Sequence, residues 1–262
     1  MTWHRFSPAV LTLLVFLLAQ GVGGALLILF GIQPIMLLSF IIMAVDVLAV
    51  LLCYLLLRNI HFSTARDVSH ISWRSGILAI IGGILGAMSI SILTQGVELP
   101  EMMQQLSLAM SRSVWGLLAM TIVGPVTEEL LFREAIEGEM LRRGASPWTA
   151  IFISALAFSA VHLNLAQGLY AFPLGIMFGI IYYKTESVVL TSLLHILNNS
   201  IVVVLLYTMG EDAVDATPAE LFGSDRMAWT FMAFSGVLSI MLIKLFWDST
   251  SLEKKEAKND PY

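Results

Sequence analysis

The residues best suited to chemistry lie in an apolar segment that begins at Gly124 and reads GPVTEELLFREAIEGE. Pro125 removes one backbone hydrogen bond and should bend a helix about one turn before the acids. Glu129 and Arg133 are four residues apart, so on a helix they share a face and can form an ion pair. Glu128 is rotated by about 100° and faces a different environment. We therefore expect the two glutamates to titrate separately.

Two histidines and an asparagine occur in two later apolar segments. Phe158 and His162 are four residues apart in AFSAVHLN, and His195 and Asn199 are four residues apart in LLHILNNS. Residues at this spacing share one helical face. Carboxylates and imidazoles are the side chains that enzymes most often use to move protons. An acid, two imidazoles and an amide on three separate helices form a constellation that packing could bring together.

Each of these features also has a purely structural explanation. A single histidine in an apolar helix usually makes an interhelical hydrogen bond. The charged run of the first segment could be a helix end that emerges at the membrane surface, since Glu134, Glu137 and Glu139 follow. Taken singly, the segments leave these explanations open, and the occurrence of all three in one chain favours a functional site.

The elements that position these side chains are predicted to be membrane helices. Hydrophobic residues make up 58% of the 262 residues, charged residues 13%, and the mean hydropathy is +0.85. Soluble domains contain about 45–50% apolar and about 25% charged residues, so this excess could not be buried in one water-soluble core. A single cysteine, Cys53, excludes a disulfide scaffold and cysteine-based zinc modules. The net charge of −5, without a basic stripe, argues against nucleic-acid binding.

We predict an all-α fold, a polytopic transmembrane helical bundle with about eight spans. A span needs about 20 mostly apolar residues. The candidate spans are residues 8–30, 34–57, 75–93, 113–138, 146–162, 168–183, 187–207 and 227–247.

The basic residues predict how this bundle lies in the membrane. With the N-terminus in the cytoplasm, all of the 14 Lys and Arg residues except Arg112 and Arg226 fall on the cytoplasmic side. Both termini are therefore expected in the cytoplasm, and the protein in the cell membrane. The first span, preceded by Arg5, is expected to be a retained signal anchor. Residues 1–247 would form one membrane domain and residues 248–262 a polar cytoplasmic tail.

Asp46 is the one aspartate within a predicted span. A charge at the bilayer centre costs about 2.5–3.5 kcal/mol on insertion scales, so Asp46 is expected to be a hydrogen-bonded packing residue. No ladder of ionisable residues leads from it toward the outside, which argues against a transporter.

The three polar segments resemble the motifs of the CPBP family. These intramembrane proteases include the type II CAAX prenyl endopeptidases and bacterial relatives of the bacteriocin-immunity and abortive-infection types. The family pattern is EExxxR, then FxxxH, then HxxxN. It is matched in order by residues 128–133, 158–162 and 195–199, each on a separate predicted span. The resemblance covers about residues 115–207.

The resemblance implies a catalytic role for four residues. Glu128 would be the general base that activates water, and His162 would help to bind and orient that water. His195 and Asn199 would stabilise the oxyanion that forms at the substrate carbonyl. Losing one such donor typically costs about 10²–10³ in rate.

Three further residues would support the site according to the resemblance. Glu129 would form an ion pair with Arg133 that keeps the site in place. Phe158 would support His162 as the first residue of the FxxxH motif. Two chemistries are described for the family, that of a metalloprotease and that of a glutamate peptidase.

A divalent metal, zinc in particular, is a possible cofactor. Glu128, His162 and His195 would form a ligand set with one position open for water, if the enzyme is metal-dependent. No orienting acid is evident for either histidine, which favours metal-independent chemistry.

The function expected from this resemblance is that of an intramembrane endopeptidase. Its substrate would be a membrane-attached protein or peptide, cut near the cytoplasmic face of the bilayer. The chain has no HExxH or GxSxG-like motif and only one intramembrane aspartate, so three other classes of intramembrane protease are unsupported. The alternative is a non-catalytic binding or immunity protein that uses the same polar cluster for structure or partner binding.

Overall fold

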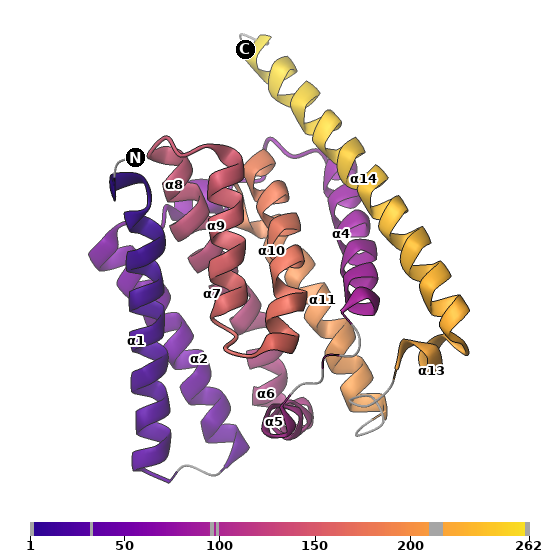
Figure 1. Cartoon of the computed structure of the whole chain (residues 1–262). Coiled ribbons are helices and arrows are strands. Elements are labelled where there is room, and N and C mark those ends of the chain that lie inside the picture. Colours follow the sequence, from indigo (N-terminus) through magenta and orange to yellow (C-terminus); the bar gives the residue numbers. More distant parts are fainter. Residues whose placement is uncertain (1–2, 32–33, 95–96, 98–99, 210–216, 260–262) are drawn as a thin grey trace.

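The computed structural model describes residues 3–31, 34–94, 97, 100–209 and 217–259. All regular structure in these ranges is helical. The helices pack side by side in one bundle, and the start of α1 and the end of α14 lie at the same end of it (Figure 1). The predicted all-helical membrane bundle is confirmed at this level, and the chain is a multi-pass membrane protein. Which end faces the cytoplasm stays a prediction.

Seven helices of the described chain are long and apolar enough to cross a membrane. They are α1 (Ser7–Leu29), α2 (Ile35–Leu52) with its π-helical continuation η2 (Cys53–Leu57), α4 (Trp73–Leu93), a compound helix over Val114–Arg142, α10 (Leu165–Thr185), α11 (Val188–Met209) and α14 (Asp225–Asn259). The shorter helices are η1 (Trp3–Arg5), α3 (Phe62–Ala65), α5 (Glu101–Ser111), α9 (Pro147–Ala160) and α13 (Pro218–Phe222). Helix α14 continues through residues 248–259 of the predicted tail, whose last three residues lie outside the described ranges.

The predicted span over residues 146–162 differs most from the structure. Helix α9 has only 14 residues, whereas a span needs about 20. The chain reverses directly after it, because Leu163 adopts a left-handed φ of 55° and the Asn164 side chain accepts a hydrogen bond from the Gln167 N–H. Asn164 thereby begins α10 at Leu165, earlier than residue 168 as predicted. The described chain therefore has seven helices of membrane length where eight spans were expected.

The compound helix carries the acidic motif. Its consecutive parts are α6 (Val114–Leu118), η3 (Ala119–Val123), α7 (Gly124–Glu129), η4 (Leu130–Gly138) and α8 (Glu139–Arg142). The parts η3 and η4 are π-helical, a wider winding that is rare and is frequently found at functional sites. Helices α1, α9, α10 and α11 all contact η4, which buries almost its whole length. The acidic motif thus lies inside the bundle.

Candidate active site

Three of the predicted side chains meet between α7 and α11. His195 Nδ1 lies 3.1 Å from Glu129 Oε1, and His195 Nε2 lies 3.6 Å from Glu128 Oε2. Because an ionised carboxylate only accepts hydrogen bonds, Nδ1 must carry the proton that it shares with Glu129. Nε2 then faces Glu128 at a distance slightly longer than a hydrogen bond, so both groups can contact the same small molecule.

The two neighbouring glutamates have different environments. The Glu129 side chain is fully buried, whereas that of Glu128 is 29% exposed. Arg133 Nε donates to Glu129 Oε2 at 3.1 Å, so the structure contains the ion pair expected from the spacing. Arg133 Nη1 also donates to Ser154 Oγ at 2.8 Å. Glu129 is thus held between Arg133 and His195, and Glu128 is the member of the pair that a substrate could approach.

The Phe158 ring packs against both imidazoles of the site and helps to fix their positions. It packs edge-on against His162 and His195, with centroid distances of 5.2 and 5.8 Å, and the Arg133 guanidinium lies 5.3 Å from its centroid. His162, in the turn after α9, has its Nδ1 2.8 Å from the Phe158 carbonyl oxygen. A carbonyl only accepts, so Nδ1 donates and Nε2 keeps its lone pair. No hydrogen bond or ion pair among the described residues joins His162 directly to Glu128.

Asn199 is positioned by a backbone carbonyl that Pro125 leaves without its helical partner. In η3, the Gly124 N–H donates to the Ala119 carbonyl five residues earlier. The next hydrogen bond of this kind would join residue 125 to Met120, but proline has no N–H. Asn199 Nδ2 donates to the Met120 carbonyl instead, at 3.0 Å. The proline before the acidic motif and the asparagine of the third motif are therefore physically linked.

The structure adds polar groups that the sequence reasoning did not assign to the site. Asn198 Nδ2 donates to Asn199 Oδ1 at 3.3 Å, and the Tyr170 hydroxyl donates to Asn198 Oδ1 at 2.8 Å. The sequence does show Asn198 beside the motif residue, but it contains no signal for Tyr170 on α10. These contacts fix the face of α11 that carries His195 and Asn199.

Asp46 has the hydrogen bond expected of a packing residue and a second, unexpected neighbour. Gln20 Nε2 on α1 donates to Asp46 Oδ1 at 2.7 Å. Asp46 also lies close enough to Glu128 for their charges to interact. Helices α2 and α7 pack against each other although they are far apart in the sequence, which brings this third carboxyl group toward Glu128.

The alternative in which the acidic run emerges at the membrane surface is wrong for Glu134 and Glu137. Both side chains are fully buried, because other helices surround η4. Glu134 pairs with Arg142 Nη1 at 3.0 Å and accepts hydrogen bonds from the Tyr182 hydroxyl and the His61 N–H. Neither carboxyl oxygen of Glu137 has a hydrogen-bond partner among the described residues.

Two of the predicted metal ligands, Glu128 and His195, lie 3.6 Å apart. His195 Nδ1 has an orienting acid, Glu129, that the sequence did not reveal, whereas His162 Nδ1 has a backbone carbonyl, that of Phe158, and no acid. However, no three His, Cys, Asp or Glu side chains in the described part of the chain lie close enough together to hold a metal ion. Glu128, His162 and His195 therefore do not form a metal site in this geometry.

A cavity of about 370 Å³ borders the turn that carries His162. Ser159, Leu163 and Asn164 contribute to its lining. Ser159 Oγ donates to the Gly168 carbonyl at 2.8 Å across the turn. His162 itself is not among the residues that line this cavity.

Comparison with known proteins points to a protease family. A family model described as "Type II CAAX prenyl endopeptidase Rce1-like" matches residues 110–201, which contain all three motifs. The "Putative membrane peptidase YdiL" of Bacillus subtilis (strain 168) is 31% identical over 85 residues. That match covers 32% of this chain and 34% of the relative, about a third of its length. No solved structure matches the chain. The two matches agree with the resemblance of the three motifs to the CPBP family, and residues 110–201 of this multi-pass membrane protein are similar to type II CAAX prenyl endopeptidases.

Proposed function

We propose that the protein is an intramembrane endopeptidase that hydrolyses peptide bonds of membrane-attached proteins or peptides, with Glu128 as its general base. One observation carries this proposal. Glu128 is partly exposed next to a buried chain of hydrogen bonds that runs from His195 through Glu129 to Arg133. A base needs access to water, and its neighbours need fixed positions.

The reaction would begin with a water molecule bound between Glu128 and His162 Nε2. Glu128 removes a proton from this water as its oxygen attacks the carbonyl carbon of the substrate. The same carboxyl group then gives the proton to the departing amine, and the peptide bond breaks. A positioned general base of this kind contributes about 10²–10⁴ in rate.

The negative charge that develops on the carbonyl oxygen would be stabilised by α11. The Asn199 amide has two N–H groups, and one of them is bound to Met120. The other can donate to the oxyanion. His195 can donate from Nε2 when the imidazole carries a proton on both nitrogens. These donors lie on a helix whose face is held by Glu129 and Met120, so they need little reorganisation during the reaction.

The substrate class follows from the family and from the membrane setting. Type II CAAX prenyl endopeptidases give the family its description, and that description supports a CAAX-type peptidase here. Because lipid excludes bulk water, the site must open to a polar phase, and we propose cleavage near the cytoplasmic face.

The proposal is tested by comparing protein termini in membranes of the native host. Cells would express the wild type, Glu128→Gln or Glu139→Gln at matched levels. Glu139 is a suitable control because it lies on the same compound helix and is paired with Arg142 and Arg143, outside the site. We expect new termini with the wild type and Glu139→Gln, and none with Glu128→Gln. Identical termini for all three folded proteins would overturn the proposal and favour a non-catalytic binding or immunity protein.

Metal dependence needs its own measurement. Once a cleaved substrate is known, the purified protein is assayed before and after treatment with a chelator. Cleavage that persists supports the metal-independent reaction described above. Cleavage that is lost, and then restored by zinc, would require Glu128, His162 and His195 to come together as ligands.

A further inference from the structure

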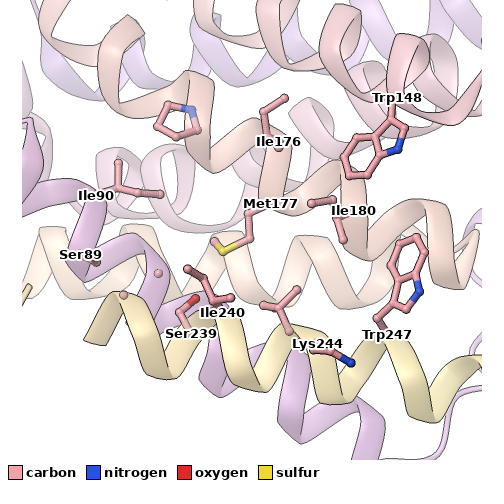
Figure 2. Close-up of a pocket in the computed structure, with 14 residues that line it drawn as sticks. Ser89, Ile90, Trp148, Ile176, Met177, Ile180, Ser239, Ile240, Lys244 and Trp247 are labelled. Carbon is pink, nitrogen blue, oxygen red and sulfur yellow. The ribbon is translucent and has the colours of Figure 1, made fainter. Parts of the chain in front are cut away.

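A second cavity lies between α4, α10, α14 and the beginning of α9 (Figure 2). Its volume is about 530 Å³, within the range of about 300–1,000 Å³ that is usual for ligand sites. Met177 lines this cavity, whereas the next residue, Phe178, contacts the His195 ring at a centroid distance of 5.3 Å. Helix α10 therefore separates the two sites, and the proposed peptidase reaction does not use the cavity.

Most of the cavity presents hydrocarbon. Its walls include Ile90, Ile176, Ile180 and Ile240. The two hydroxyl groups in the lining already have backbone partners. Ser89 Oγ donates to the Met232 carbonyl at 3.0 Å, and Ser239 Oγ donates to the Gly82 carbonyl at 2.7 Å. This part of the cavity is thus suited to an alkyl chain.

The other end of the cavity gathers hydrogen-bond donors. Figure 2 shows Trp148, Lys244 and Trp247 together there. Indole and ammonium groups donate hydrogen bonds and accept none. A second cation, Lys184, lies 4.1 Å from the centroid of the Trp247 ring. Lys244 Nζ pairs with Asp248 at 2.7 Å, but both side chains are largely exposed, and ion pairs of this kind are weak. An anionic group can therefore share Lys244.

This donor end lies where a membrane interface would be. Trp148 is at the beginning of α9, and Lys244 and Trp247 are near the end of the Asp225–Thr250 span. These helix ends lie at the same end of the bundle as the start of α1 (Figure 1). Tryptophan and lysine are typical of the level of the lipid headgroups. The cavity thus runs from headgroup level into the hydrocarbon region.

We propose that this cavity binds an anionic phospholipid of the surrounding bilayer, with one acyl chain against the isoleucines and the phosphate against Lys244 and the two indoles. The charge of the donor end favours an anionic headgroup over a zwitterionic one. Because α10 is shared, the lipid would pack directly behind the helix that supports His195.

Native mass spectrometry of the full, delipidated protein tests this proposal without any proteolytic assay. Phosphatidylglycerol and phosphatidylcholine with identical acyl chains are titrated separately, and the affinity of the first bound lipid is measured. We expect the wild type to bind phosphatidylglycerol at least several-fold more tightly. Lys244→Gln should abolish this preference. Arg74→Gln removes the same charge at the exposed start of α4 outside the cavity, and should keep the preference.

A second pair of variants tests the site of the acyl chain. Ile240→Phe places a larger side chain in the cavity and should weaken the binding of both lipids. Met241→Phe makes a similar change at the next residue, which is also exposed but does not line the cavity, and should have no effect. Equal behaviour of Lys244→Gln and Arg74→Gln, or of Ile240→Phe and Met241→Phe, would overturn the proposal. None of these outcomes depends on whether the protein is a peptidase.

Discussion

Glu128 and Glu134 lie on the same compound helix, less than two turns apart. They are the same residue type, but their carboxyl groups differ in whether a substrate or water can reach them. Glu128 is partly exposed and faces the side chain of His195. Glu134 is fully buried and bound by Arg142, Tyr182 and the backbone of His61. The carboxyl group of Glu128 is therefore available for chemistry, whereas both oxygens of the Glu134 carboxyl group are engaged in structural contacts. In a membrane helix, exposure and pairing therefore separate a reactive acid from a structural one.

This comparison predicts that activity and stability can be lost separately. Cys53, the single cysteine, is completely buried, so the reaction of a thiol-reactive dye reports unfolding in detergent.

The largest effect is expected for Glu128→Gln. The amide cannot accept the proton from water, so the cleavage rate should fall by about 10²–10⁴. The unfolding temperature measured at Cys53 should not change, because Glu128 lies outside the buried ion pair. A variant that unfolds early would show that Glu128 is structural in the same way as Glu134.

Arg133→Met should have the next largest effect, on stability. It leaves the buried Glu129 without its guanidinium partner, although His195 Nδ1 still donates to it, and breaking a buried pair costs about 3–5 kcal/mol. Dye labelling of Cys53 during unfolding measures the change. The double variant Arg133→Met/Glu129→Gln is the control and should recover part of the loss. If the single variant were as stable as the wild type, the ion pair would have no structural role.

Asn199→Leu should reduce turnover by about 10²–10³, as expected for one lost oxyanion donor. Its effect should fall on kcat more than on KM, since the developing charge exists only in the transition state. Steady-state kinetics on a cleaved substrate measure both constants. An effect confined to KM would place Asn199 in substrate binding instead.

Tyr182→Phe tests whether the buried Glu134 has a structural role only. It removes the hydroxyl that donates to Glu134 and should lower the free energy of unfolding by about 1–3 kcal/mol. The kinetic constants of the folded enzyme should stay the same. Slower turnover at unchanged stability would mean that the Glu134 cluster takes part in the reaction.

The smallest effect is expected for Pro125→Ala, which restores a backbone N–H near the Met120 carbonyl. This N–H would compete with Asn199 for that carbonyl, so kcat should fall by less than in Asn199→Leu. Stability should change by no more than about 1 kcal/mol, because one hydrogen bond replaces another. A wild-type kcat would show that Met120 does not position Asn199.

Much of the fold could be predicted because its signals are local. Apolar runs of sufficient length predict helices, and seven of the eight predicted spans correspond to membrane-length helices. The eighth, over residues 146–162, corresponds to α9, which ends at Ala160 and has only 14 residues. The break after residue 162 was predicted, and the turn at Leu163 and Asn164 occupies it. Hydropathy indicates an apolar segment here but does not give the length of its helix.

The sequence by itself determined the helical membrane architecture, the pairing of Glu129 with Arg133 and the occurrence of three polar motifs on separate helices. These depend on hydropathy and on the spacing of residues along one helix. Only the tertiary structure decided that His195 contacts both glutamates, that Asp46 lies near Glu128 and that Glu134 and Glu137 are buried. Each of these features depends on how one helix packs against another, and the spacing of residues within a single helix carries no information about its neighbours.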